Sequence, residues 1–228
     1  TGTSIVKKHA DGVKIYEAID KVLIPTTAGT GSEVTPGAVL VNPGTNFKRA
    51  LGGPAVSAKR AILCPELTLS LPRELTATIG MDALAHATES FTAKCSNSVT
   101  RMYSKEAFRL ISKSLPIVMD SPTSLEHRHD MLLGSCLAGY AIYNSNTGAA
   151  HSMAYPMGIY HGVNHGFAIT LLLPEIVKHN EGLNGSLYKD LMEFLPQEFK
   201  NNRLSAFLYS LLDSFSLKTK LSDFGVKS

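Results

Sequence analysis

The sequence predicts an α/β region over residues 1–71, followed by an all-α helical domain over residues 72–228. Short apolar and β-branched segments separated by Gly and Pro occupy the first part. Longer segments with apolar residues at helical spacing occupy the second part. The change comes at Leu71 and Pro72, because a proline fits the first turn of a helix. Nothing between the two parts resembles a linker, so we expect them to pack against each other.

Four short strands are expected in the first region. Residues 22–24 form one, and residues 61–64 form another. Residues 37–42 and 47–51 flank the segment Pro43-Gly44-Thr45-Asn46, whose composition favours a hairpin turn. These two segments therefore predict an antiparallel pair.

The second region predicts a series of helices. The first covers residues 73–91, with Gly80 as an interruption. Residues 99–119 and 125–143 repeat apolar side chains at helical spacing, which is typical of core helices. Shorter helices are expected over residues 151–156, 165–179 and 204–215.

Composition narrows the classes of function. The chain has 44% hydrophobic and 18% charged residues, as compact folded proteins do. A formal charge of +3 without a basic run argues against a nucleic-acid partner. Its three scattered cysteines favour neither a disulfide framework nor a thiolate zinc site, so a reducing, cytoplasmic setting is expected. No apolar stretch approaches the roughly 20 residues of a membrane span, so we expect no contact with a membrane.

The segment GMDALAHATES (80–90) carries a candidate metal site. Asp82 and His86 are four residues apart, so a helix places them on one face about one turn apart. Alone, such a pair is more often a hydrogen-bonded pair at the surface. Its neighbours are apolar or small, and a buried carboxylate beside an imidazole is costly unless something pairs with both. A bound cation would satisfy both groups.

A second histidine cluster lies in GAAHSMAYPMGIYHGVNHG (148–166). It contains His151, His161 and His165, three of the eight histidines of the chain, within fifteen residues. One carboxylate with several imidazoles suits Fe²⁺ or Zn²⁺ and leaves a coordination position for a substrate oxygen.

The segment IPTTAGTGSEVTP (24–36) is a candidate nucleotide-binding loop. A strand that runs into small and glycine residues lets backbone N–H groups and hydroxyls approach a phosphate or a ribose. Without other information, the same composition is more often an ordinary turn.

These three segments, in this order, resemble those of the iron-containing (group III) alcohol dehydrogenases. Weaker similarity extends from residues 171–180 to residues 217–226. The resemblance implies a dehydroquinate synthase-like architecture, a homo-oligomer, and hydride transfer between a small alcohol or aldehyde and NAD or NADP with Fe²⁺ or Zn²⁺. Family members are longer, and only 23 residues precede Ile24. Residues 1–71 are therefore expected to be part of a truncated dinucleotide-binding region, and residues 72–228 the helical metal-binding and catalytic domain.

The resemblance also implies roles for individual residues. Many members have His at the position of Tyr155, where it is thought to help relay the alcohol proton; a tyrosine, with an ordinary pKa of about 10, is a poorer base. His161 could replace it, or Tyr155 could only pack while His161 is solvated. The implied metal ligands are Asp82, His86, His151 and His165, and the implied cofactor contacts are Thr26, Thr27, Gly29, Thr30, Gly31, Ser32 and Lys48.

Two alternatives to the dehydrogenase remain open at this point. A shortened member could bind metal without catalysis. A related metal- and NAD-using enzyme, such as a dehydroquinate synthase-like lyase or a zinc glycerol dehydrogenase, would share the architecture. The segments GMDALAHATES and HGVNHG resemble those of the iron-containing alcohol dehydrogenases, so they argue against these related enzymes by resemblance alone.

Overall fold

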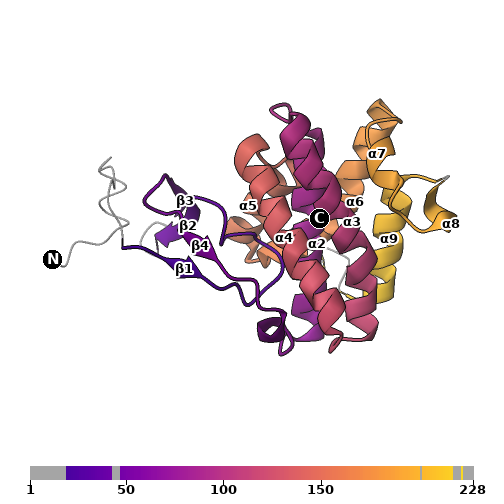
Figure 1. Cartoon of the computed structure of the whole chain (residues 1–228). Helices are drawn as coiled ribbons and strands as arrows, with labels where there is room; N and C mark the ends of the chain where they lie inside the picture. Colours follow the sequence, from indigo (N-terminus) through magenta and orange to yellow (C-terminus); the bar gives the residue numbers. More distant parts are fainter. Residues whose placement is uncertain (1–18, 43–46, 201, 218–221, 223–228) are drawn as a thin grey trace.

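The computed structural model describes residues 19–42, 47–200, 202–217 and 222. A strand-bearing segment lies beside a helical bundle, as predicted (Figure 1). The elements are β1 (Val22–Leu23), β2 (Gly37–Asn42), β3 (Phe47–Gly52), β4 (Arg60–Ala61), η1 (Pro65–Thr68), α2 (Arg73–Thr92), α3 (Ser98–Asp120), α4 (Leu125–Ser145), α5 (Ala149–His161), α6 (His165–Leu183), α7 (Lys189–Met192), α8 (Gln197–Lys200) and α9 (Leu204–Phe215).

Two strand pairs make up the β structure of the described residues. Strands β2 and β3 are antiparallel, with Gly37 opposite Gly52 and Asn42 opposite Phe47. The predicted hairpin is confirmed in its strands, while its turn, residues 43–46, lies outside the described residues. Strands β1 and β4 are parallel but only two residues long. The fourth strand is shorter than predicted because Pro25, after β1, has no N–H to extend the ladder.

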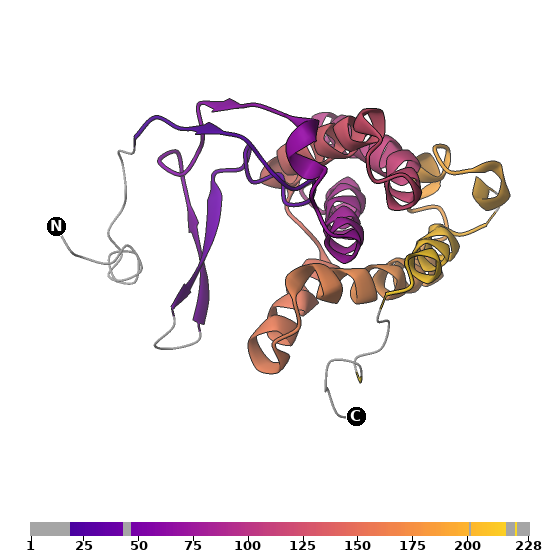
Figure 2. The same cartoon turned by 90° about the horizontal axis from the view of Figure 1, so that it is seen from below.

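Helix α2 is the centre of the bundle. It packs against α3, α4 and α6, and every residue from Gly80 to Phe91 is buried (Figure 2). The predicted interruption at Gly80 does not occur. A Cβ at this position would lie 2.4 Å from Leu115 Cδ1, so the glycine lets α3 approach while the helix continues. A helix buried on all sides is an environment in which polar side chains need partners.

Helices α3 and α4 form an antiparallel pair against α2. Asn97 caps α3 by accepting hydrogen bonds from the backbone N–H groups of Val99 and Thr100, at 3.0 and 3.1 Å. Fully buried side chains, among them Ile111 and Leu132, fill the core between the helices. Truncating either to alanine should cost about 2–5 kcal/mol of stability.

Helices α5 and α6 run further than the sequence predicts. The apolar pattern suggests an end of α5 at Pro156, yet the helix continues to His161 and stops at Gly162, whose φ is 65°. Pro174 likewise lies inside α6, which reaches Leu183. An internal proline removes one helical hydrogen bond without forcing an end, and packing between α5 and α6 supports both helices. In the part of the chain that the structure describes, no helix combines the length and hydropathy of a membrane span.

Candidate metal centre

Three helices bring four of the predicted residues together. Asp82 and His86 lie one turn apart on α2, His151 lies in the first turn of α5, and His165 begins α6. Asp82, His86 and His151 are buried and each offers a ligand atom within 4.8 Å of the others. The side chain of His165 is 43% exposed and marks the side of the cluster that solvent reaches.

Two distances in the cluster match the ligand spacing of a tetrahedral metal site. Asp82 Oδ1 lies 3.3 Å from His151 Nε2 and 3.5 Å from His165 Nε2. Ligands at about 2.1 Å from a tetrahedral ion lie about 3.4 Å from one another. Asp82 Oδ1 and His151 Nε2 are buried and have no hydrogen-bond partner among the described residues. The residues therefore fit a cation, which would satisfy both atoms.

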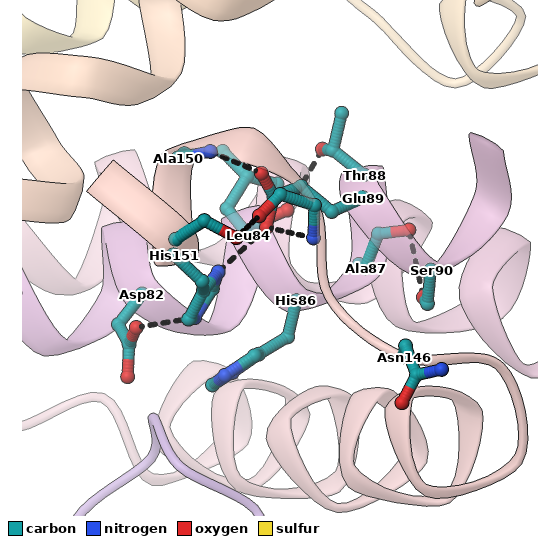
Figure 3. Close-up of polar contacts among 12 residues, drawn as sticks. Asp82, Leu84, His86, Ala87, Thr88, Glu89, Ser90, Asn146, Ala150 and His151 are labelled. Carbon is teal, nitrogen blue, oxygen red and sulfur yellow. Dashed lines mark hydrogen bonds and ion pairs between the residues drawn. The ribbon is translucent and has the colours of Figure 1, made fainter. Parts of the chain in front are cut away.

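Hydrogen bonds orient two of the imidazoles with Nε2 toward the cluster. The Nδ1 of His86 lies 3.1 Å from the carbonyl oxygen of Gly29, and the Nδ1 of His151 lies 2.6 Å from Glu89 Oε2. Nδ1–H donates in both cases, which leaves the lone pair of Nε2 for a metal. Figure 3 shows Asp82 and Glu89 on opposite sides of the His151 ring, with His86 beside it. The rings of His86 and His151 stack at a centroid distance of 4.4 Å.

Glu89 is a further buried residue of the cluster, and the sequence pattern did not single it out. Its buried carboxylate also accepts hydrogen bonds from the backbone N–H groups of Gly148, at 2.8 Å, and Ala150, at 2.7 Å. It therefore holds both the ring of His151 and the first turn of α5 (Figure 3). Its spacing could have indicated it, because Glu89 follows His86 by three residues in the same segment and therefore lies on the same helical face.

Charge in the cluster favours a cation as well. Burial would raise the pKa of Asp82, but the surrounding imidazoles outweigh it and hold that pKa well below its usual range. Burial lowers the pKa of His86. Burial also opposes protonation of His151, yet the carboxylates of Asp82 and Glu89 that face its ring raise its pKa to about 9. The pKa of Glu89 is lowered despite its burial, chiefly through its hydrogen bond to His151. Two buried carboxylates thus share one imidazole.

The predicted cofactor loop lies against this cluster. The carbonyl of Gly29 contacts His86, and a Cβ on Gly29 would lie 2.2 Å from Ile79 Cγ2. Gly31 has a φ of +59°, and a Cβ there would lie 2.6 Å from the Cα of Gly139 on α4. Only glycine permits these two close approaches.

Thr30 and Ser32 line one side of a cavity of about 880 Å³. Residues of β2 and of the end of α4, including Ile142 and Tyr143, line it as well. Thr26 and Thr27 precede this turn, exposed and half-buried respectively. Lys48 pairs with Val41 in the β2–β3 ladder, and its side chain lies outside the described part of the structure.

The two predicted relay residues, Tyr155 and His161, lie at different distances from the cluster. The ring of Tyr155 is 6.3 Å from the ring of His165, and its side chain is partly exposed. His161 is exposed at the far end of α5, ten residues beyond His151. At a helical rise of 1.5 Å per residue, His161 lies about 15 Å along α5 from His151. The structure therefore does not bring His161 into the cluster.

Comparison with known proteins gives two family models that match the chain. The model of the Fe-containing alcohol dehydrogenase family, C-terminal, matches residues 76–228, and the model of iron-containing alcohol dehydrogenase matches residues 3–65. A 1,3-propanediol dehydrogenase of Citrobacter freundii is 35% identical over 202 residues, which cover 85% of this chain and 52% of that protein. The corresponding protein of Klebsiella pneumoniae is 32% identical, with 99% of this chain and 62% of that protein covered.

Solved structures agree with these matches. A sulfoacetaldehyde reductase from Bifidobacterium kashiwanohense, in complex with NAD⁺, aligns with a TM-score of 0.90 at 30% identity. That alignment covers all of this chain and 60% of the reductase. A 1,3-propanediol oxidoreductase aligns with a TM-score of 0.88 at 32% identity and covers 94% of this chain and 58% of the other. The chain therefore spans about half to three fifths of the relatives it matches.

Proposed function

The chain belongs to the iron-containing alcohol dehydrogenase family, and from that premise we propose that it carries the metal-binding and catalytic part of an NAD(P)-dependent dehydrogenase. The substrates would be small alcohols or aldehydes. The observation that carries this proposal is the spacing of Asp82 Oδ1 from the Nε2 atoms of His151 and His165, which matches that of neighbouring ligands on a tetrahedral ion. We further propose that residues 72–228 form the helical catalytic domain and residues 1–71 belong to the cofactor-binding region.

Asp82, His86, His151 and His165 would hold Fe²⁺ or Zn²⁺. A bound ion of this kind would act as a Lewis acid and stabilise negative charge on the substrate oxygen. The family and the presence of NAD⁺ in a similar structure support a nicotinamide cofactor. Both metals share these ligand types, so the ligand set fits either one.

Other residues of the chain would bind and orient the reactants. Thr30 and Ser32 line the cavity, where their hydroxyl groups can donate hydrogen bonds to a cofactor. Ile142 and Tyr143 also line this cavity and add apolar and aromatic surface to it. The small, buried residues of α2 exclude water from the cluster, which strengthens electrostatic interactions there. Tyr155 lies closer to the cluster than His161 does, and it is the better candidate to donate a hydrogen bond to the substrate oxygen.

Metal content, cofactor binding and turnover separate the proposal from its alternatives. The purified chain, loaded anaerobically with Fe²⁺ or separately with Zn²⁺, should bind one ion and quench NADH fluorescence saturably. Oxidation of 1,3-propanediol, the substrate named for the relatives, should then produce NADH. His165→Ala should lower both metal content and turnover, whereas His179→Ala, a histidine outside the cluster, should leave both unchanged.

Each outcome decides a separate part of the proposal. Full metal occupancy in His165→Ala by elemental analysis would remove His165 from the ligand set. Metal binding without NADH binding at millimolar cofactor would favour a metal-binding protein without catalysis. A cytoplasmic location and a homo-oligomer remain predictions, from the cysteine content and from the family respectively.

A further inference from the structure

Helix α5 carries an apolar face that starts at the metal cluster. Its buried residues are Ala150, His151 and Ala154, so most of the helix beyond its first turns lies at the surface. Tyr155 and Ile159 follow His151 at intervals of four residues, which places all three on one side of the helix. Tyr155 is 41% exposed and Ile159 is 38% exposed. The side of α5 that supplies a metal ligand therefore continues outward as an accessible apolar surface.

The metal cluster is open to solvent on this same side. His165 is the partly exposed member of the cluster, and the ring of Tyr155 lies 6.3 Å from its ring. Ile159 lies one helical turn beyond Tyr155. At the end of the helix, a Cβ on Gly162 would meet nothing within 4 Å. A molecule held at the cluster can therefore extend along α5 past Tyr155 and Ile159.

This part of the chain carries no acidic or basic side chain apart from histidine. Between Asp130 and Glu175 the sequence contains no Asp, Glu, Lys or Arg. That stretch includes most of α4, all of α5 and the first half of α6. A charged group on a bound molecule would lose hydration here without an opposite charge to compensate. An uncharged hydrocarbon tail instead gains free energy by leaving water.

We propose that Tyr155 and Ile159 are specificity-determining residues, which bind the uncharged apolar tail of a primary alcohol or aldehyde along α5. This inference rests on the proposed function, because it takes the metal cluster as the site of the substrate oxygen. At a rise of 1.5 Å per residue, Ile159 lies about 12 Å along α5 from His151. That length corresponds to an extended tail of about eight carbon atoms. Alcohols of medium chain length should therefore be preferred to the shortest ones.

The opposite side of α5 provides a matched control. Met153 and Tyr160 are also exposed apolar side chains of this helix. Tyr160 follows His151 by nine residues, so it lies about half a turn away from the proposed tail surface. A tail that starts at the cluster would not contact it.

Alkyl hydroxamates test the surface without cofactor or turnover. The Zn²⁺-loaded chain is titrated by calorimetry with acetohydroxamate and with octanohydroxamate, and the ratio of the two dissociation constants reports the tail alone. Octanohydroxamate should bind at least about tenfold more tightly, because each CH₂ group that becomes fully buried adds about fourfold. Ile159→Gln should lower this ratio to about threefold or less, since an amide replaces the apolar contact. Tyr160→Gln should keep the wild-type ratio.

Three results would overturn the proposal. The first is a wild-type ratio near one, and the second is an Ile159→Gln ratio equal to that of the wild type. The third is an equal loss in Ile159→Gln and Tyr160→Gln, which would show that general hydrophobicity and not this face binds the tail. A second copy of the chain is the competing occupant of the face. A wild-type dimer that Ile159→Gln dissociates in sedimentation, without any dependence on tail length, would assign the face to that contact and overturn the proposal.

Nuclear magnetic resonance tests the same surface in a chain that holds no metal. With isotope-labelled isoleucine methyl groups, 1-octanol should shift the resonance of Ile159, which is identified by its loss in Ile159→Gln. Ethanol at the same concentration should not shift it. Ile62 is the control, because it is half-exposed but lies outside α5, and its resonance should respond less. An Ile159 resonance that does not respond to 1-octanol, or responds no more than that of Ile62, overturns the proposal.

Turnover of alcohols links the surface to the proposed function. The value of kcat/KM should rise from ethanol to 1-octanol in the wild type and in Tyr160→Gln, and less steeply in Ile159→Gln. In the wild type, 8-hydroxyoctanoate, which has the same length as 1-octanol but ends in a carboxylate, should be poorer than 1-octanol by at least about tenfold. Turnover that does not depend on tail length would overturn the tail proposal and leave the proposed function in place. If no alcohol is oxidised while the hydroxamates behave as expected, the proposed function fails and the tail surface stands.

Discussion

Replacing Glu89 by glutamine should separate metal binding from folding. The carboxylate accepts three hydrogen bonds, from His151 Nδ1 and from the N–H groups of Gly148 and Ala150. An alanine would leave three donors without their acceptor, two of them buried, at about 1–3 kcal/mol for each buried one. That loss is a large share of the stability of many domains. Glutamine has nearly the same shape, so Glu89→Gln should remain folded.

The amide of Glu89→Gln has one acceptor oxygen and one NH₂ group. If the oxygen takes the place of Oε2, it accepts from Gly148 and His151 as a neutral acceptor, which holds the imidazole less strongly than the carboxylate does. If it accepts from Ala150 instead, the NH₂ faces Gly148 and His151 and forces the imidazole to present an unprotonated Nδ1. The proton then moves to Nε2, the atom that faces Asp82 and would bind the metal. Loss of such an outer hydrogen bond lowers metal affinity about 10- to 100-fold, or about 1.4–2.7 kcal/mol.

The assay is a competition of the purified protein with a chelator for Zn²⁺, read by elemental analysis. Glu181→Gln is the matched control, because Glu181 is equally buried and contacts the first turn of α9 as Glu89 contacts that of α5. It should lose a similar amount of stability and keep its zinc affinity. A Glu89→Gln protein whose zinc affinity stays within twofold of the wild type would refute this reasoning.

Two further predictions concern the loop and the cysteines. Gly31→Ala should lower the stability by about 2–4 kcal/mol, because its positive φ strains an alanine and the new Cβ would meet Gly139; an unchanged thermal midpoint would contradict this. Exposed Cys95 should react readily with a thiol reagent near pH 8, whereas Cys136, with a pKa of about 12, is ionised in only about one molecule in ten thousand. Equal reaction rates of the two in separate single-cysteine variants would show that Cys136 is not shielded.

The sequence by itself determined the elements that depend on local periodicity. The spacing of Asp82 and His86 sets one carboxylate and one imidazole on a single helical face, whatever that helix packs against. The apolar repeats of α3 and α4 likewise predicted two core helices within a residue or two of their observed ends. The end of α5 was predicted too early because Pro156 lowers helix propensity locally while packing sustains the helix. The end of α6 was predicted at His179, four residues before the observed end at Leu183.

Only the tertiary structure decided which distant residues meet. Glu89 contacts His151 across 62 positions of sequence, which no periodic pattern reveals. The two histidines that end α5 and begin α6 look equivalent in sequence. Helix geometry nevertheless carries His161 away from the cluster, while the turn after it brings His165 back to Asp82. Local spacing fixes the face of a helix, whereas the partners of that face depend on how the helices pack.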